Sequence, residues 1–191
     1  MEAVTLQSGR VIGERVDADR CTVFRGIPFA APPVGGNRYR APQPVQPWAG
    51  VLRADRFASA CLQPLHGADH LLAQFGFAAV PECGISENCL FLNVWTPTKG
   101  SADKLPVIVW LYGGGFRVGS GSHPVNDGTG LAREGVIVVA PNYRLGSLGF
   151  LAHPALTAEA GTSGNYGLLD MVAALRWVHD NIAAFGGDPG N

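Results

Sequence analysis

Apolar residues in the first part of the chain form short alternating runs that are separated by polar turns. Residues 4–16, broken at Ser8-Gly9, and residues 21–24 are runs of this kind, and residues 90–95 alternate in a similar way. Alternation with a period of two is typical of strands, so we predict a β meander near the start of the chain and a further strand over 90–95. Residues 30–48 hold five prolines and are expected to be extended and irregular.

The middle of the chain carries apolar runs without alternation. Residues 105–112 and 136–140 are continuous apolar segments. Strands that are buried on both faces of a parallel sheet have this appearance. Residues 126–134 lie between the two runs and favour a short helix, which completes a strand–helix–strand unit. We therefore predict an α/β fold with a mostly parallel central sheet and flanking helices.

A long helix is predicted to begin near Asn165, because asparagine is a favourable residue at a helix N-cap. The apolar positions that follow are three or four residues apart and so fall on one helical face. These positions are Leu168, Val172, Leu175, Val178, Ile182 and Phe185. Gly186-Gly187 comes directly after them and is expected to end the helix.

Composition and charge exclude two classes of protein. The chain has 191 residues, of which 47 % are hydrophobic and 15 % charged, and its 14 Lys and Arg balance 15 Asp and Glu. This apolar content excludes intrinsic disorder, and the lack of a basic excess argues against nucleic-acid binding through bulk charge. The first residues show neither the basic nor the apolar region of a signal peptide, and no apolar run approaches the roughly 18 residues that span a bilayer. We expect neither a nucleic-acid nor a membrane partner, and we leave the compartment open with the cytoplasm as the default.

Cysteines and histidines give no metal-binding pattern. The four cysteines, which include no CxxC pair, are Cys21, Cys61, Cys83 and Cys89. Free buried thiols in a reducing cytosol are one interpretation of them. His66 and His70 are four residues apart, but this segment lacks the glutamate of HExxH and contains Gly67, so we interpret both as loop residues. We expect no metal and no cofactor.

The run Gly113-Gly114-Gly115-Phe116 directly follows the first continuous apolar segment. A dinucleotide fingerprint would need glycine at Val118, and a phosphate-binding P-loop would need lysine at Ser120, so neither motif is present. A tight turn without chemistry is one remaining interpretation. The other is an oxyanion hole, in which successive glycine amides turn toward a developing negative charge with no Cβ in the way.

The sequence around this run resembles the type-B carboxylesterase and cholinesterase family of the α/β-hydrolase superfamily. Tyr112 and the four residues after it resemble the oxyanion loop of that family, and matches to other family segments follow in the family's order over essentially the whole chain. These segments are residues 26–30 (GIPFA), 32–35 (PPVG), 38–39 (RY), 86–94 (SENCLFLNV, with Asn88 where aspartate is usual), 142–146 (NYRLG), 149–151 (GFL), 164–170 (GNYGLLD) and 185–189 (FGGDP).

The resemblance implies roles for the glycine run and its neighbour. Gly114 and Gly115 would donate two backbone N–H groups to the oxyanion, and Gly113 would shape the loop. Phe116 would either line the acyl pocket of the substrate or pack beside the loop.

The resemblance also implies three structural pairs. Cys61 and Cys89 would form a disulfide, which needs an oxidising compartment. The two implied ion pairs, which would tie loops to the sheet, are Arg38 with Glu87 and Arg144 with Asp170. No tryptophan lies between Cys61 and Cys89, where cholinesterases hold part of their choline site and this chain has only Phe75 and Phe77. A small neutral carboxylic ester is therefore the expected substrate.

The sequence contains no nucleophile elbow of the form G-x-S-x-G. Residues 119–122 have the wrong spacing, and residues 161–164 precede a helix without a strand before them. By resemblance the serine would lie about seven residues past Asn191, with the catalytic acid and histidine further on.

We therefore interpret residues 1–191 as a single incomplete domain, the N-terminal part of an α/β-hydrolase fold that stops before the nucleophile strand. The parent would be a serine esterase, and the chain alone is expected to be inactive because it needs the C-terminal part of the domain. Two alternatives remain, namely a non-catalytic adhesion or binding domain similar to cholinesterases and a truncated product with a scaffold role.

Overall fold

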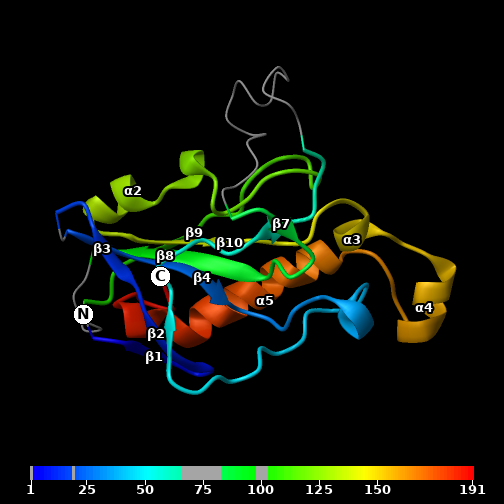
Figure 1. The fold of residues 1–191 in the computed structure, drawn as a ribbon, viewed down its shortest axis with the longest axis horizontal. Helices are drawn as coiled ribbons and strands as arrows, with labels where there is room; N and C mark the ends of the chain where they lie inside the picture. Colours follow the sequence, from blue (N-terminus) through cyan, green and yellow to red (C-terminus); the bar gives the residue numbers. More distant parts are fainter. Residues whose placement is uncertain (1, 19, 66–82, 98–102) are drawn as a thin grey trace.

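A five-stranded sheet forms the centre of the molecule in the computed structural model, which describes residues 2–18, 20–65, 83–97 and 103–191 (Figure 1). In spatial order its strands are β3 (Glu14–Val16), β4 (Cys21–Pro28), β8 (Phe91–Thr96), β10 (Ile137–Pro141) and β9 (Val107–Val109). The strand predicted over 90–95 is confirmed as β8, and the run 136–140 is confirmed as β10, which is buried at every residue.

The direction of the strands corrects one prediction. Only β9 and β10 pair in parallel, whereas the other three neighbouring pairs of this sheet are antiparallel. Parallel strands need a long crossover connection, and the connection between β9 and β10 carries the 3₁₀ helix η2 (Pro124–Asn126) and helix α2 (Thr129–Arg133). The sheet is therefore mixed rather than mostly parallel over the strands described.

The predicted meander is confirmed, but its strands divide between two sheets. Strands β1 (Val4–Leu6) and β2 (Gly9–Ile12) pair antiparallel, and β5 (Val51–Arg53) joins β2 in a separate three-stranded sheet. The segment that contains the five prolines is irregular apart from a short 3₁₀ helix, η1 (Gly35–Asn37). A further pair, β6 (Ala60–Cys61) with β7 (Ile85–Ser86), lies beside the main sheet.

Helices cover both faces of the central sheet, with α2 on one side and α5 (Tyr166–Asn181) on the other (Figure 1). Helix α5 continues into the 3₁₀ helix η3 (Ile182–Phe185), where the ring of Phe185 meets that of Phe24 edge to face at 4.9 Å. On the opposite face Ala132 of α2 packs with Val23 and Trp95. Two short helices, α3 (Gly146–Phe150) and α4 (Pro154–Ala160), connect β10 to α5.

Strand β9 differs from the prediction in length and burial. The sequence predicts a strand over 105–112 that is buried on both faces, but only Val107–Val109 is a strand, and Ile108, Trp110 and Leu111 are exposed. The reason is its position, because β9 pairs with β10 alone and forms an edge of the described sheet.

Helix α5 starts where predicted, and the predicted apolar stripe is confirmed over its second half, where Val178, Ile182 and Phe185 are buried, but not over its first half. Leu168, Val172 and Leu175 are 41, 42 and 46 % exposed. The buried residues of this first half are instead Tyr166, Gly167, Asp170 and Ala174, and Trp177 and Asn181 are buried beside Val178. The stripe fails in the first half because the residues buried there include the carboxylate of Asp170, and no rule of apolar spacing selects such a residue. Asn165 has a left-handed φ of 59°, and its side chain makes no cap hydrogen bond.

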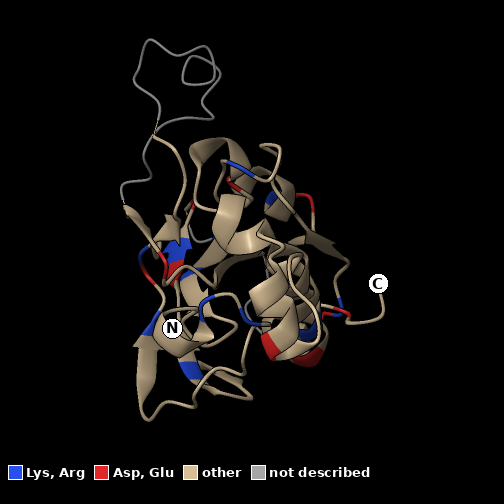
Figure 2. Cartoon of the chain, turned by 90° about the vertical axis from the view of Figure 1, so that its right-hand side faces the viewer, with Lys and Arg blue, Asp and Glu red and all other residues tan. Residues whose placement is uncertain are grey.

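Charged residues are scattered over the chain in the view of Figure 2, without gathering into one basic face. Among the described helices, none combines the length and the apolar character that a membrane span requires.

Candidate functional site

The glycine run forms a tight loop directly after β9. The carbonyl of Gly114 accepts hydrogen bonds from the backbone N–H groups of Arg117 (3.1 Å) and Val118 (3.3 Å), so the chain turns back on itself. Gly114, with a φ of 131°, allows this turn because a Cβ there would overlap the carbonyl oxygen of Val118. Around Gly115, by contrast, no atom beyond its chain neighbours lies within 4 Å of the place that a Cβ would take. The loop therefore requires glycine at its closed side and has open space at Gly115.

Four successive backbone amides in this loop have no acceptor. The N–H groups of residues 113–116 donate to no atom of the described chain, and all four residues are exposed. Backbone N–H groups in folded proteins almost always have a partner in the protein or in water. A run of amides that is free of protein partners can donate to the oxygen of a bound molecule, which is the chemistry of an oxyanion hole.

The start of the loop is fixed by two tyrosines. The rings of Tyr112 and Tyr143 stack at 4.5 Å between centroids, and the Tyr143 hydroxyl donates to the Tyr112 carbonyl at 2.6 Å. In return the Tyr112 hydroxyl donates to the Tyr143 carbonyl at 3.3 Å. Burial raises the pKa of Tyr143 to about 12 and raises that of Tyr112 as well. Both phenols therefore stay protonated at neutral pH and keep this pair of hydrogen bonds.

The end of the loop is fixed by buried polar side chains. Asn142, directly after β10, accepts from the N–H of Gly121 at 2.9 Å and donates to the carbonyl of Ser59 at 3.2 Å. The hydroxyls of Ser120 and Ser122 are 2.5 Å apart, and both serines are buried. Together with Gln63, which bonds to Gly119, these side chains hold residues 119–122 against the strand ends.

Sequence reasoning missed this polar network around the loop. A polar Asn142 that directly follows the fully buried strand β10 is the one signal in the sequence that could have indicated it. Gln63 gives no such signal, because its partner is 56 residues away in the chain.

Phe116 packs beside the loop and also keeps an open side. Its ring lies 4.9 Å from that of Phe150 and 6.4 Å from that of Tyr143, while the residue remains 48 % exposed. The packing interpretation is therefore observed, and the exposed part of the ring leaves a role toward a substrate open.

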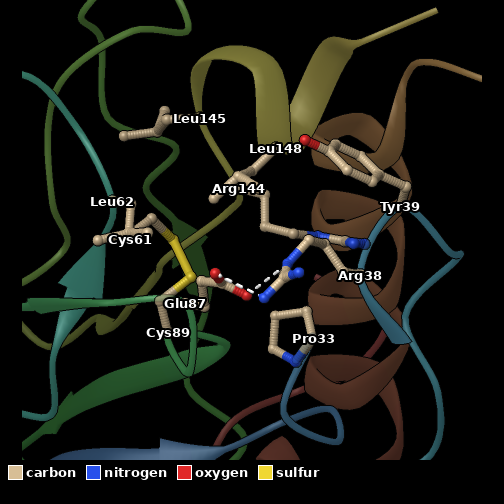
Figure 3. A pocket seen from close by; sticks show the side chains of 10 residues that line it. All are labelled: Pro33, Arg38, Tyr39, Cys61, Leu62, Glu87, Cys89, Arg144, Leu145 and Leu148. Atoms are coloured by element: carbon tan, nitrogen blue, oxygen red, sulfur yellow. Dashed lines mark hydrogen bonds and ion pairs between the residues drawn. A yellow bond between two sulfur atoms is a disulfide. The ribbon is translucent and has the colours of Figure 1, made fainter. Parts of the chain in front are cut away.

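A disulfide and an ion pair both line one small cavity (Figure 3). Cys61 and Cys89 are joined with their Cα atoms 4.9 Å apart, so the interpretation as free thiols holds only for Cys21 and Cys83. In the same view the guanidinium of Arg38 meets both carboxylate oxygens of Glu87 at 2.8 and 2.9 Å. The hydrogen bond with Glu87 raises the pKa of Arg38.

The second implied ion pair is fully buried. Arg144 donates to both oxygens of Asp170 at 2.8 and 2.7 Å, and its backbone N–H adds a third hydrogen bond at 3.0 Å. The side chains are 3 % and 0 % exposed, respectively. Burial raises the pKa of Asp170, and the hydrogen bonds from Arg144 oppose that shift. This pair joins the segment after β10 to helix α5.

The described histidines have no catalytic or metal-binding arrangement. His123 and His153 accept through Nδ1 from backbone N–H groups at the starts of η2 and α4, and His179 is 75 % exposed at its side chain. No group of three or more potential metal ligands occurs among the residues that the structure describes. His66 and His70 lie outside the described residues, as do Phe75 and Phe77.

Comparisons with known proteins agree on one family. The family model described as "Carboxylesterase family" matches residues 1–191. The chain is 52 % identical over 185 residues to "Fumonisin B1 esterase" of Sphingopyxis macrogoltabida, covering 96 % of this chain and 32 % of the relative. It is 46 % identical to "Para-nitrobenzyl esterase" of Bacillus subtilis, covering 100 % and 37 %, and 44 % identical to "Cholinesterase" of Mus musculus, covering 97 % and 30 %.

A solved structure confirms the match at the level of the fold. The structure titled "PNB esterase" superposes with a TM-score of 0.85 at 45 % identity, over 98 % of this chain and 36 % of that one. The chain thus spans about a third of the length of the curated relatives that it matches.

Proposed function

This chain belongs to the carboxylesterase family, and we propose that it supplies the oxyanion loop of a serine hydrolase that cleaves carboxylic esters. Its fold is the corresponding part of an α/β hydrolase. The observation that carries the proposal is the run of four backbone amides over residues 113–116 that have no acceptor among the described residues, on a loop whose two ends are hydrogen-bonded to neighbouring side chains.

In the proposed reaction, this loop stabilises the negative charge that develops in the transition state. A serine attacks the acyl carbon of the ester, and the carbonyl oxygen becomes negative as the tetrahedral intermediate forms. The amides of Gly114 and Gly115 would donate to that oxygen, each contributing about 3–4 kcal/mol of transition-state stabilisation. The alcohol then leaves, and water hydrolyses the acyl-enzyme to restore the serine.

The hydrogen bonds at the edge of β9 support a nucleophile that arrives from the segment after residue 191. Residues 186–191 run beside the start of β9: the Leu105 N–H donates to the Gly186 carbonyl at 2.8 Å, and the Val107 N–H donates to the Asn191 carbonyl at 2.9 Å. Continued in the same direction, a strand would pass along the free edge of β9. Gly113 lies six positions beyond Val107, so that strand would reach the loop after about six residues.

The substrate proposed is a small neutral ester. Phe116 and Phe150 form an apolar contact next to the free amides, and apolar walls beside a few polar donors are usual for pockets that hold such molecules. Residues 1–191 contain no G-x-S-x-G motif for a serine nucleophile, so the chain alone is expected to lack turnover.

Ester hydrolysis by the complete protein and by the separate chain tests this proposal. We expect the complete protein to hydrolyse p-nitrophenyl butyrate and to lose that activity on treatment with a serine-directed organophosphate. The chain of residues 1–191 should show no turnover above buffer. A complete protein that folds but neither hydrolyses esters nor reacts with the organophosphate would favour a non-catalytic binding domain instead.

A further inference from the structure

We propose that Gln63 is a positioning residue for catalysis, because it holds the glycine loop in the shape that aims its amides. This inference rests on the proposed function, since it concerns the same loop. Gln63 lies just after β6, two residues beyond the disulfide residue Cys61, whereas the loop follows β9.

The side-chain amide of Gln63 makes two of its three hydrogen bonds to the main chain of the loop. Its Oε1 accepts from the N–H of Gly119 at 2.8 Å, and its Nε2 donates to the carbonyl of Gly119 at 2.9 Å. A third hydrogen bond from Nε2 reaches the carbonyl of Cys61 at 3.1 Å. Gln63 therefore satisfies both backbone groups of Gly119 at once, and its local bond to Cys61 fixes the side chain that does so.

Gly119 transmits the effect of Gln63 to the backbone amides of the glycine run. We call its two hydrogen bonds with Gln63 the clamp. It has a φ of 123°, and a Cβ there would lie 2.7 Å from the carbonyl oxygen of Gly113 as well as against the ring of Tyr112. Gly119 thus lies directly against Gly113, the first residue of the glycine run. Its neighbour Val118 also donates to Gly114, so a shift of Gly119 moves both sides of the loop.

The disulfide restrains the backbone next to Gln63. Cys61 is bonded to Cys89, and both cysteines are almost fully buried in the main core. Because Gln63 follows Cys61 so closely, the position of its side chain is fixed relative to β8 rather than to a free loop. Without Gln63 the N–H and the carbonyl of Gly119 would both lose their partners, and only the side chains around residues 120–122 would still hold the end of the loop.

Steady-state kinetics on variants of the complete protein test this role. We expect Gln63→Leu to lower kcat on p-nitrophenyl butyrate on the order of 10- to 100-fold, with KM changed less than about twofold, because a misaligned oxyanion hole weakens transition-state binding more than substrate binding. Gln63→Glu keeps the shape of the side chain but places a second acceptor against the Gly119 carbonyl, so it should also lower kcat. This isosteric variant carries the test if Gln63→Leu does not fold.

The matched control is Gln43→Leu. Gln43 is exposed and donates to the carbonyl of Ala41 two residues earlier, just as Gln63 donates to Cys61, but it has no contact with the loop. Its removal should leave kcat and KM within about twofold of the wild type.

Affinity for a trifluoromethyl ketone separates positioning from a merely structural role, since the hemiketal that it forms with the serine carries an oxygen at the position of the oxyanion. That affinity should fall in parallel with kcat/KM in the Gln63 variants. Folded Gln63 variants with wild-type kcat, or with unchanged affinity for the ketone, would overturn the inference while leaving the proposed function intact. A complete wild-type protein without ester turnover would overturn both.

Discussion

Burial distinguishes the ion pair between Arg144 and Asp170 from the other ion pair that the resemblance implies. Both side chains are almost inaccessible and share three hydrogen bonds, counting the backbone N–H of Arg144. Arg38 and Glu87 have a similar bidentate geometry, but their side chains are 44 % and 25 % exposed. Exposed pairs contribute little because water and salt screen them, so the buried pair is expected to dominate stability.

Arg144→Ala is therefore expected to lower the free energy of unfolding by about 3–5 kcal/mol, since it leaves the Asp170 carboxylate buried without its partner. Arg10 is exposed on β2 and serves as the control, because Arg10→Ala should change that energy by less than about 0.5 kcal/mol. Thermal and urea unfolding of the complete protein measure both variants. Equal shifts for the two variants would contradict the structural role assigned to the pair.

At the scale of elements, the local patterns succeed where a segment has its own period or motif. Strand β8 follows from alternation and β10 from a continuous apolar run. The start of α5 lies where Asn165 predicts it, although the Asn165 side chain makes no cap hydrogen bond. The pattern fails for the burial of β9 and for the first half of the stripe of α5, because burial there depends on which neighbours cover a segment and no local rule contains that information.

The candidate site divides in the same way. The glycine run and each member of the paired residues lie within short sequence segments that resemble those of the family, so the resemblance identifies them. Gln63, Asn142 and Tyr143 act on the loop through contacts between distant segments. Such contacts become visible only once the strands are placed side by side, and among these three residues only Asn142, a polar residue directly after the buried strand β10, gives a signal in the sequence.

The shape of the glycine loop makes a prediction at this scale. Gly114→Ala should lower kcat of the complete protein on the order of 100-fold or more, because the new Cβ would overlap the Val118 carbonyl and force the loop open. Gly36→Ala is the matched control, since a Cβ at Gly36 meets no atom within 4 Å and should leave kcat unchanged. Wild-type turnover in Gly114→Ala would mean that the loop shape is not needed for catalysis.

At the scale of the whole molecule, the chain forms a core and leaves apolar side chains exposed in two places. Ile108, Trp110 and Leu111 are exposed around β9, as is the stripe Leu168, Val172 and Leu175 of α5. The relatives are about three times as long as this chain, and apolar surface of this kind usually marks a site of contact. We interpret these surfaces as places where the rest of an α/β-hydrolase domain packs, and for β9 this agrees with the direction of residues 186–191 along it.

The central claim is that the amides of the glycine loop receive the oxyanion of an ester. A crystal structure of the complete protein inhibited by an organophosphate tests it most directly, because the phosphoryl oxygen of the serine adduct mimics that oxyanion. We predict that this oxygen lies about 2.7–3.1 Å from the backbone nitrogens of Gly114 and Gly115. An adduct whose phosphoryl oxygen points away from both nitrogens, toward solvent or toward other donors, would contradict the claim.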